Sequence, residues 1–282
     1  SDYAVYSFMP VVGELVVNQD NRASKFSHDN EIAKPHYYKV TFDNGITTEM
    51  APTTRGVHLR FSYPTTGDAY LVLDGYTDMS EIKIDPAKRQ ISGWVNNQRF
   101  VNNSKSFRNY FVVQFDKPMD ALNGWVGDRK ETDINSLIGS PELITVPKSS
   151  FKQSPSSGVE ACFGSFKAGD ELLLKTAISY VSEENARENI ERECQHWDFD
   201  QVKSASERIW NEWLGKIDVQ GGSFQQKTKF YTDLWHVLLG RHKIDDSNGE
   251  YPDYLSGGER IGKQTRIHTI APKFQVRTLP KD

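Results

Sequence analysis

Apolar and polar side chains alternate in short segments through the first 180 residues, which is the pattern of half-buried β-strands. The clearest example is residues 37–42, which meet residues 46–50 across Asp43-Asn44-Gly45. An Asn-Gly pair between two alternating segments predicts a hairpin, because glycine tolerates the positive φ that the turn requires. We therefore expect an antiparallel strand pair here.

Similar segments follow, and turn residues such as Asp85-Pro86 separate them. They occupy residues 56–61, 70–74, 82–84, 91–95, 110–115, 162–166 and 172–178, and residues 1–6 also read as part of a strand. Because no helical segment is interleaved with them, the pattern favours an antiparallel β-sandwich over a parallel sheet. Residues 148–158 are rich in Ser, Pro and Gly, and we expect a loop there.

The period of the apolar residues changes after residue 181. Ser182 fits the N-cap of a first helix, and Ser223 the capping box of a third, because their side chains can accept hydrogen bonds from free backbone N–H groups. A second helix follows Asp198. Apolar residues then recur at helical spacing: Ala186, Ile190, Cys194 and Trp197 in the first helix, Phe199, Val202, Ala205, Ile209 and Trp213 in the second, and Phe230, Leu234, Val237 and Leu238 in the third. Gly215 should end the second helix.

These patterns predict a β-sandwich domain over residues 1–180, with its N-terminus truncated, followed by helices. Three helices with exposed apolar stripes do not make a closed core of their own. Either more chain follows in the natural protein, or the helices pack on the sandwich.

Composition and charge narrow the class of protein. The net charge of −4 argues against a nucleic-acid-binding protein, which would need a basic face to release counterions. No apolar run approaches the roughly 20 residues that a transmembrane helix needs. Two cysteines, Cys162 and Cys194, support neither a disulfide framework nor a zinc site.

The densest polar cluster lies in residues 26–31, where His28, Asn30 and Glu31 are candidate ligands for a sugar hydroxyl or an ion. The alternative is that this segment is only a polar connection between strands. His58 and Arg60 are two residues apart and should share one face of a sheet, for which a solvated face is the simpler reading.

Two other polar groups favour structural readings. The acidic run of the first helix, from Glu183 to Glu193, contains Arg187 and Arg192, which is typical of a solvated helix face. The segment Asp246-Ser247-Asn248-Gly249 lacks the ligand positions of a calcium loop and predicts a hydrated turn. The sequence contains no Gly-rich phosphate loop, no His-Glu-x-x-His motif and no Gly-x-Ser-x-Gly elbow, and thus no stand-alone catalytic signature of these kinds.

Several segments resemble glycoside hydrolase family 92. Residues 26–40 (FSHDNEIAKPHYYKV) follow the pattern of that family, which usually has glycine where this chain has His36. The similarity continues through residues 45–50 and 53–55, and residues 179–189 resemble the family's exit from its sandwich. Residues 210–217 and 230–236 resemble its first barrel helices. The order and spacing agree along nearly the whole chain, although residues 267–277 depart from the commoner pattern.

The resemblance implies a β-sandwich followed by linker helices, residues 181–222, and by the start of an (α/α)6 barrel, residues 223–282. It also implies an inverting, calcium-dependent exo-α-mannosidase that removes terminal α-linked mannose from glycans. The family's general acid, general base and principal calcium ligands are expected beyond Asp282, and its sugar-site loops before Ser1. We can therefore assign no catalytic or metal-binding residue in this segment, and we expect the segment alone to be inactive.

Other functions stay open at this point. The sandwich could be a carbohydrate-binding or structural module without catalysis, and the architecture also hosts other glycosidases and sugar phosphorylases. The resemblance favours a secreted, periplasmic or cell-surface protein, although the segment contains no signal peptide. The sequence does not indicate an oligomeric state.

Overall fold

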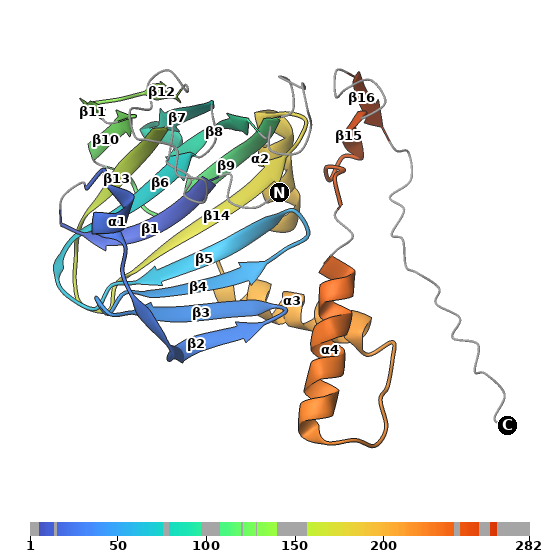
Figure 1. The fold of residues 1–282 in the computed structure, drawn as a ribbon. Helices are drawn as coiled ribbons and strands as arrows, with labels where there is room; N and C mark the ends of the chain where they lie inside the picture. Colours follow the sequence, from blue (N-terminus) through green and yellow to red (C-terminus); the bar gives the residue numbers. More distant parts are fainter. Residues whose placement is uncertain are drawn as a thin grey trace, which may run out of the picture.

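The computed structural model describes residues 6–13, 16–75, 79–96, 108–119, 121–127, 129–139, 157–239, 243–253 and 260–263. Two antiparallel sheets form a sandwich in this part of the chain, followed by helices (Figure 1). The predicted fold class, a β-sandwich followed by helices, is confirmed.

The smaller sheet has five strands, in the order β1 (Tyr6–Val12), β6 (Gly67–Gly75), β13 (Ser157–Phe166), β10 (Ala121–Val126) and β11 (Arg129–Thr132). The larger sheet has nine, in the order β12 (Ser136–Gly139), β7 (Ser80–Asp85), β8 (Gln90–Asn96), β9 (Arg108–Phe115), β14 (Glu171–Ser179), β5 (Gly56–Ser62), β4 (Thr47–Pro52), β3 (Tyr37–Phe42) and β2 (Phe26–Lys34). A short helix, α1 (Gln19–Arg22), precedes β2, and a 3-10 turn (Pro86–Lys88) joins β7 to β8.

The predicted hairpin is confirmed as β3 and β4, which pair Tyr38 with Met50. Gly45 has a φ of 83°, and its amide donates to the carbonyl of Phe42, which closes the turn. The turn at Asp85-Pro86 is also confirmed. Of the predicted loop at 148–158, residues 157 and 158 belong to β13, and residues 148–156 lie outside the described ranges.

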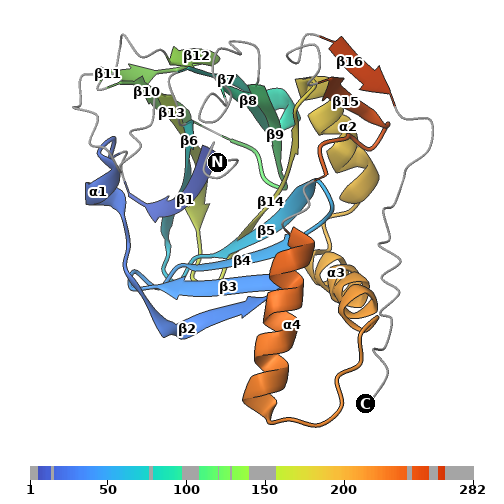
Figure 2. The same ribbon diagram turned by 45° about the vertical axis from the view of Figure 1, so that its right-hand side comes forward.

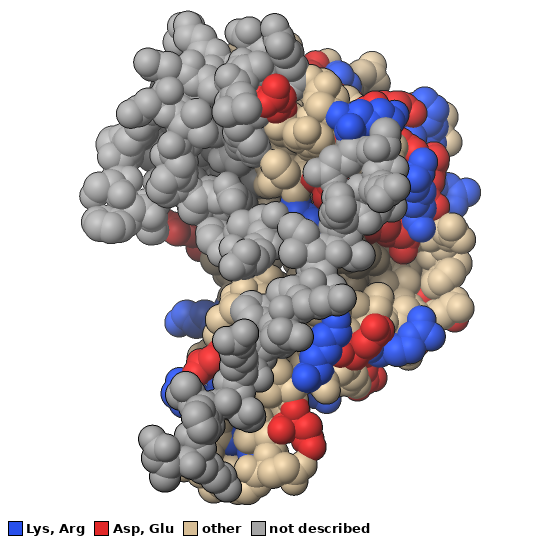
Figure 3. Space-filling view, turned by 90° about the vertical axis from the view of Figure 1, so that its right-hand side faces the viewer, with Lys and Arg blue, Asp and Glu red and all other residues tan. Residues whose placement is uncertain are grey.

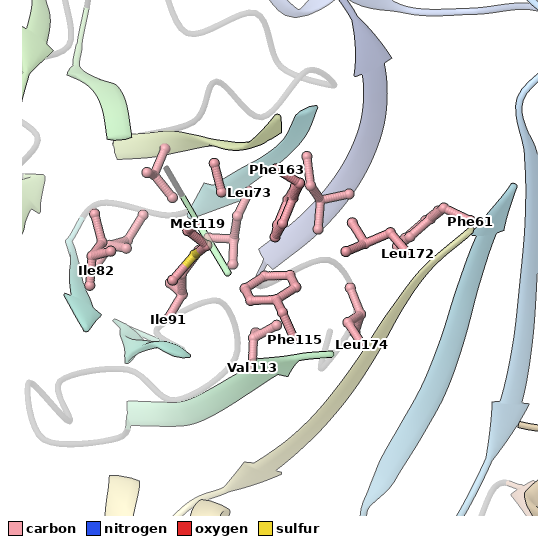
Figure 4. Close-up of a cluster of buried hydrophobic side chains, with 14 of the residues drawn as sticks. Phe61, Leu73, Ile82, Ile91, Val113, Phe115, Met119, Phe163, Leu172 and Leu174 are labelled. Carbon is pink, nitrogen blue, oxygen red and sulfur yellow. The ribbon is translucent and has the colours of Figure 1, made fainter. Parts of the chain in front are cut away.

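The main core lies between the two sheets, where aromatic and aliphatic side chains from both inner faces meet (Figure 4). Strand alternation selects its members. Phe111, Val113 and Phe115 of β9 point inward, whereas Val112 points to the outer face of the larger sheet. The sheet is therefore apolar on both faces at its centre, and the outer face needs a cover.

Helices α2 (Glu183–Glu193) and α3 (Phe199–Leu214) supply that cover. Ala186 and Ile190 of α2 pack on Val112 and Ala177, and Phe199 of α3 packs near Tyr37. The predicted cap of α2 is confirmed, since the side chain of Ser182 accepts a hydrogen bond from the amide three residues on, and Asp198 caps α3 in the same way. The first two helices thus pack on the sandwich.

Helix α4 (Phe224–Leu239) is different. The capping box is confirmed, because the amide of Ser223 donates to Gln226 and the amide of Gln226 donates to the hydroxyl of Ser223. Yet none of the residues of α4 is buried, and the helix stands out from the sheets beside α3 (Figures 1 and 2). After α4, a small hairpin forms from β15 (Glu250–Asp253) and β16 (Arg260–Lys263). The segment 267–277 lies outside the described residues.

Candidate functional site

The predicted polar cluster lies on β2, the edge strand of the larger sheet, so the reading as a mere connection between strands was wrong. The register between β2 and β3 shifts between Phe26 and Glu31, so the pairing of the two strands is irregular there. Nδ1 of His28 lies 2.6 Å from Oε2 of Glu31, and the hydroxyl of Tyr38 donates to Oε1 of Glu31 at 2.5 Å. The structure therefore brings His28 and Glu31 together with Tyr38, a residue the sequence did not single out.

The hydrogen bonds that Glu31 accepts favour the ionised form of its carboxyl group. The hydrogen bonds from Tyr38 and from His28 hold the pKa of its carboxyl below the usual value. Burial, together with the bond to Glu31, raises the pKa of Tyr38 to about 12, so this phenol stays protonated. The side chain of His28 is 88% exposed and can contact a ligand. Asn30 is exposed on the same strand, but the structure does not tie it to the other two residues.

A second polar network lies where the larger sheet meets α3. Oε1 of Glu49 accepts from the hydroxyl of Tyr37 at 2.5 Å, and Oε2 accepts from Nε of Arg60 at 2.7 Å. Arg60 also donates to Asp200 of α3 at 3.2 Å. Burial pushes the pKa of Glu49 upward, but the bonds from Arg60 and Tyr37 outweigh it, and the net pKa is lowered. Through Arg60, the carboxylate of Glu49 links the larger sheet to α3.

His58 and Arg60 share one face of β5 as predicted, since both contact the ring of Phe199. The reading of that face as solvated was wrong, because His58 is fully buried beneath Trp197 and Phe199. Burial, and then the charge of Lys175, lowers the pKa of His58 to about 4. The imidazole is therefore neutral near pH 7. The sequence could not reveal this, because the covering aromatic rings lie about 140 residues away along the chain.

The acidic run on α2 is only partly a solvated face. Glu184 pairs with Arg187, and its side chain is 80% exposed, as predicted. In contrast, Glu193 accepts hydrogen bonds from the Thr53 hydroxyl at 2.8 Å and from Nη1 of Arg55 at 2.7 Å. The side chains of Arg55 and Glu193 are 10% and 15% exposed. The tip of the β4–β5 hairpin is thereby fixed to the end of α2.

The turn after α4 is present, as the amide of Gly249 donates to the carbonyl of Asp246 at 2.9 Å. The prediction that it is hydrated was wrong for Asp246, which is only 3% exposed. Burial raises the pKa of this carboxyl, although the hydrogen bonds from Ser179, Asn185 and Asn189 act in the opposite direction. The spacing of Asn185 and Asn189, four residues apart on one helix, is the signal that could have indicated this site.

The described residues do not form a metal-binding site. No group of three or more His, Cys, Asp or Glu side chains within the described ranges is arranged to hold one. His28 and Glu31 alone do not provide the six to eight oxygen ligands that calcium takes. On the face shown in Figure 3, acidic and basic side chains lie interspersed. None of the helices in the described part of the chain has the length and hydropathy required to cross a bilayer.

Comparisons with known proteins match both parts of the chain. Residues 1–179 match the family described as "Glycosyl hydrolase family 92 N-terminal domain", and residues 185–270 match "Glycosyl hydrolase family 92 catalytic domain". The division of residues 181–282 into linker helices and barrel at residue 223 stays a prediction.

Solved structures give the same picture. A family GH92 inverting mannosidase from Bacteroides thetaiotaomicron is 30% identical, with a TM-score of 0.77 over 92% of this chain and 33% of that one. A GH92 α-mannosidase from the same organism, in complex with mannoimidazole, is 26% identical, with a TM-score of 0.72 over 92% of this chain and 34% of that one.

A curated protein from Arthroderma benhamiae, named as an uncharacterized secreted glycosidase, is 24% identical over 87% of this chain and 33% of its own length. The chain thus spans about a third of the length of these relatives. Since a family match covers well over half of the residues, the chain belongs to glycosyl hydrolase family 92.

Proposed function

We propose that this chain is part of an inverting exo-α-mannosidase that hydrolyses terminal α-linked mannose from glycans. The observation that carries the proposal is the 30% identity to an inverting mannosidase, aligned over 92% of this chain and across both family regions. Inversion requires one carboxylic acid to protonate the leaving oxygen and one carboxylate to activate water, roughly 6.5–9.5 Å apart.

We further propose that these two carboxyl groups are contributed from outside this segment. Three of the buried carboxylates that the structure describes are already engaged in other contacts. Glu49 is bonded to Arg60, Asp74 is paired with Arg22 in a buried ion pair, and Asp246 is surrounded by neutral donors. Each of these contacts fixes one element to another, and such positions suit scaffolding better than proton transfer to a substrate.

Exposed apolar residues on the last helices fit this proposal. Phe224, Val237 and Leu239 of α4 are 81%, 60% and 43% exposed, and Ile209 of α3 is 50% exposed. A soluble protein seldom leaves such a series of large apolar side chains in water without a partner. In the proposed enzyme, neighbouring helices of the catalytic domain would cover them.

The experiment compares residues 1–282 with a form extended through the rest of the catalytic domain. We expect the extended form to hydrolyse an aryl α-mannoside with inversion, followed by NMR of the first anomer released, and residues 1–282 to be inactive. Turnover by residues 1–282 alone, or retention of configuration by the extended form, would contradict the proposal.

Calcium belongs to this proposal as a cofactor of the extended form, where it would supply electrostatic stabilisation and positioning of the sugar. The described residues do not fit a calcium site, so we assign it no ligand here. We expect a chelator to abolish turnover of the extended form and added calcium to restore it. Turnover that resists the chelator would remove the ion from the proposal.

A second function is favoured by one observation, the pairing of an exposed His28 with the half-buried Glu31. Phe26 lies beside His28, with ring centroids 5.7 Å apart, and is 44% exposed. An aromatic ring next to polar groups suits the C–H face and hydroxyls of a sugar. Titration of residues 1–282 with mannobiose, followed by calorimetry, should show saturable binding that His28→Ala weakens. An unchanged affinity in that variant would exclude this site.

The name of the curated relative also suggests a location. That relative is named as a secreted glycosidase, and we propose that the protein containing this chain likewise acts outside the cytoplasm on mannose-containing glycans. Fractionation of the producing cells, with the chain detected by antibody, tests this. Recovery in the cytoplasmic fraction alone would contradict it.

A further inference from the structure

Residues 245–250, which form the turn after α4, are held against one polar face of α2. Asn185, Glu188, Asn189 and Arg192 follow the spacing i, i+3, i+4, i+7, which places them along one side of the helix. The apolar residues Ala186 and Ile190 point instead into the sheet. Helix α2 therefore has two contact surfaces, an apolar one for the sandwich and a polar one for this turn.

Asp246 is the centre of the contact. Its Oδ2 accepts from the hydroxyl of Ser179 at 2.6 Å and from Nδ2 of Asn185 at 2.8 Å, and its Oδ1 accepts from Nδ2 of Asn189 at 2.8 Å. Ser179 ends β14, so one carboxylate joins the larger sheet, α2 and the turn. Hydrogen bonds to an ionised acceptor are stronger than those between neutral groups.

The other residues of this helix face bind the turn on either side of Asp246. Oδ1 of Asn189 accepts from the amide of Ser247 at 2.8 Å, and Arg192 donates to the carbonyl of Ser247 at 2.9 Å. Asn248 donates to Glu188 at 2.9 Å. Because these bonds reach the backbone of the turn as well as its side chains, they fix its orientation as well as its distance from α2.

Arg55 provides an independent anchor next to this group. Its Nε donates to the carbonyl of Asp245 at 2.6 Å, and its Nη2 lies 3.3 Å from Oδ2 of Asp245. Its Nη1 donates to Glu193 at 2.7 Å. The β4–β5 hairpin, the end of α2 and the turn are thus joined through a single guanidinium group, whose side chain is only 10% exposed.

These contacts contrast with those of the preceding helix, since α4 buries no residue. We propose that they form a latch, by which the chain that leaves the sandwich with α4 is brought back and fixed to it. The latch consists of Asp246 with Ser179, Asn185, Glu188, Asn189, Arg192 and Arg55. Resting on the proposed function, the latch also sets how the rest of the catalytic domain is oriented against the sandwich, with Asp246 as a positioning residue.

Hydrogen exchange of residues 1–282 tests the latch. Asp246→Ala removes an acceptor of three hydrogen bonds, and we expect exchange of the amides in residues 244–253 to accelerate by about tenfold or more. Asp246→Asn keeps one carbonyl oxygen and should give an intermediate rate. Amides of β9 and β14 should keep their protection, because the sandwich core is untouched. Unchanged exchange in residues 244–253 would overturn the latch.

Two further variants keep this test sound if Asp246→Ala fails to fold. Asn189→Ala removes one donor from the helix side and should accelerate exchange in the same residues. In the double variant with Asp246→Asn, the effects should be less than additive, because both changes break the same bond. Asp233→Asn is the matched control, since it neutralises an exposed carboxylate on α4 and should leave residues 244–253 unchanged.

The role of Asp246 in positioning the catalytic domain is tested separately, in the extended form. Asp246→Asn should lower kcat severalfold, while the pH dependence of kcat keeps its limbs, because Asp246 does not transfer a proton. A displaced limb, or an unchanged kcat, would overturn the positioning role. If the unsubstituted extended form does not hydrolyse α-mannosides, the proposed function fails. The exchange experiment still decides the latch.

Discussion

The β-sandwich and helix α4 use their apolar residues in opposite ways. Between the two sheets, Phe111, Phe115 and Leu174 are at most 2% exposed, whereas in α4 Phe230 is 38% and Phe224 is 81% exposed. Both regions have regular secondary structure and sound caps or turns. The difference is that strand alternation directs side chains into a closed layer, whereas α4, which lies beside α3, buries none of its residues. Hydrogen-bonded secondary structure therefore does not by itself show where the stability of a chain resides.

The largest effect should come from truncating a ring in the closed layer. Phe115→Ala removes a side chain that packs against Phe163 with ring centroids 5.0 Å apart. We expect the free energy of unfolding to fall by about 3–5 kcal/mol, from lost burial and the cavity left behind. Urea unfolding followed by circular dichroism measures this. A loss below about 1 kcal/mol would mean that the layer between the sheets is not the main source of stability.

The free energy of unfolding should depend on pH because of His58, on the covered outer face of the larger sheet. His58 is buried, and its pKa is lowered from 6.5 to about 4, so the unfolded state binds a proton first as the pH falls. The stability that this neutral imidazole contributes is complete above pH 6.5 and is lost towards pH 4. The change amounts to about 3 kcal/mol. Unfolding measured across this range should reveal it.

His58→Phe should remove this part of the pH dependence, because a phenyl ring can pack beneath Trp197 and Phe199 without titrating. Lys175, His196, Arg60 and Asp198 stay in place and contribute equally to both proteins. The comparison is therefore the difference between the two profiles. Parallel profiles between pH 6.5 and 4 would show that His58 is not buried in solution.

Substitution of a glycine at a close contact inside the smaller sheet should lower the stability of the sandwich moderately. Gly158 faces the indole of Trp125, and a Cβ at this position would lie 1.9 Å from its Cζ2. Gly158→Ala should therefore destabilise the sandwich by about 1–3 kcal/mol through overpacking. Gly67→Ala is the control, because a Cβ at this position would lie 3.4 Å from Cγ1 of Val12, which is an ordinary contact. Equal melting temperatures for the two variants would contradict the packing seen here.

Turns and helix caps could be predicted from the sequence, whereas contacts between distant segments could not. Asn44-Gly45 and Ser182 indicated a turn and a cap correctly, because their partners lie within a few residues. Strand β2 was missed because an exposed edge strand buries no alternating face and so lacks the period on which its prediction depends.

The predictions that Asp246 and His58 are solvated were wrong for another reason. Asp246 finds its donors 57 to 67 residues away, and His58 is covered by Trp197 of the α2–α3 connection and Phe199 at the start of α3. A polar residue in a turn or on a strand looks the same in sequence whether water or protein surrounds it. The candidate site on β2 was located by composition, but Tyr38, which bonds to Glu31, became visible only through strand pairing.

The smallest effect should come from the same truncation as the largest, made in α4. Phe230→Ala removes a ring whose described aromatic contact is an edge-on one with Tyr231, at 5.3 Å between centroids. Because this ring is already 38% exposed, we expect a loss of about 1 kcal/mol or less in residues 1–282, measured as for Phe115→Ala. A loss close to that of Phe115→Ala would show that α4 is covered in solution, by another copy of the chain or by other residues of its own. In the extended form, where the proposed catalytic domain would cover α4, the same substitution should cost more, and that increase would measure how much of the helix the domain buries.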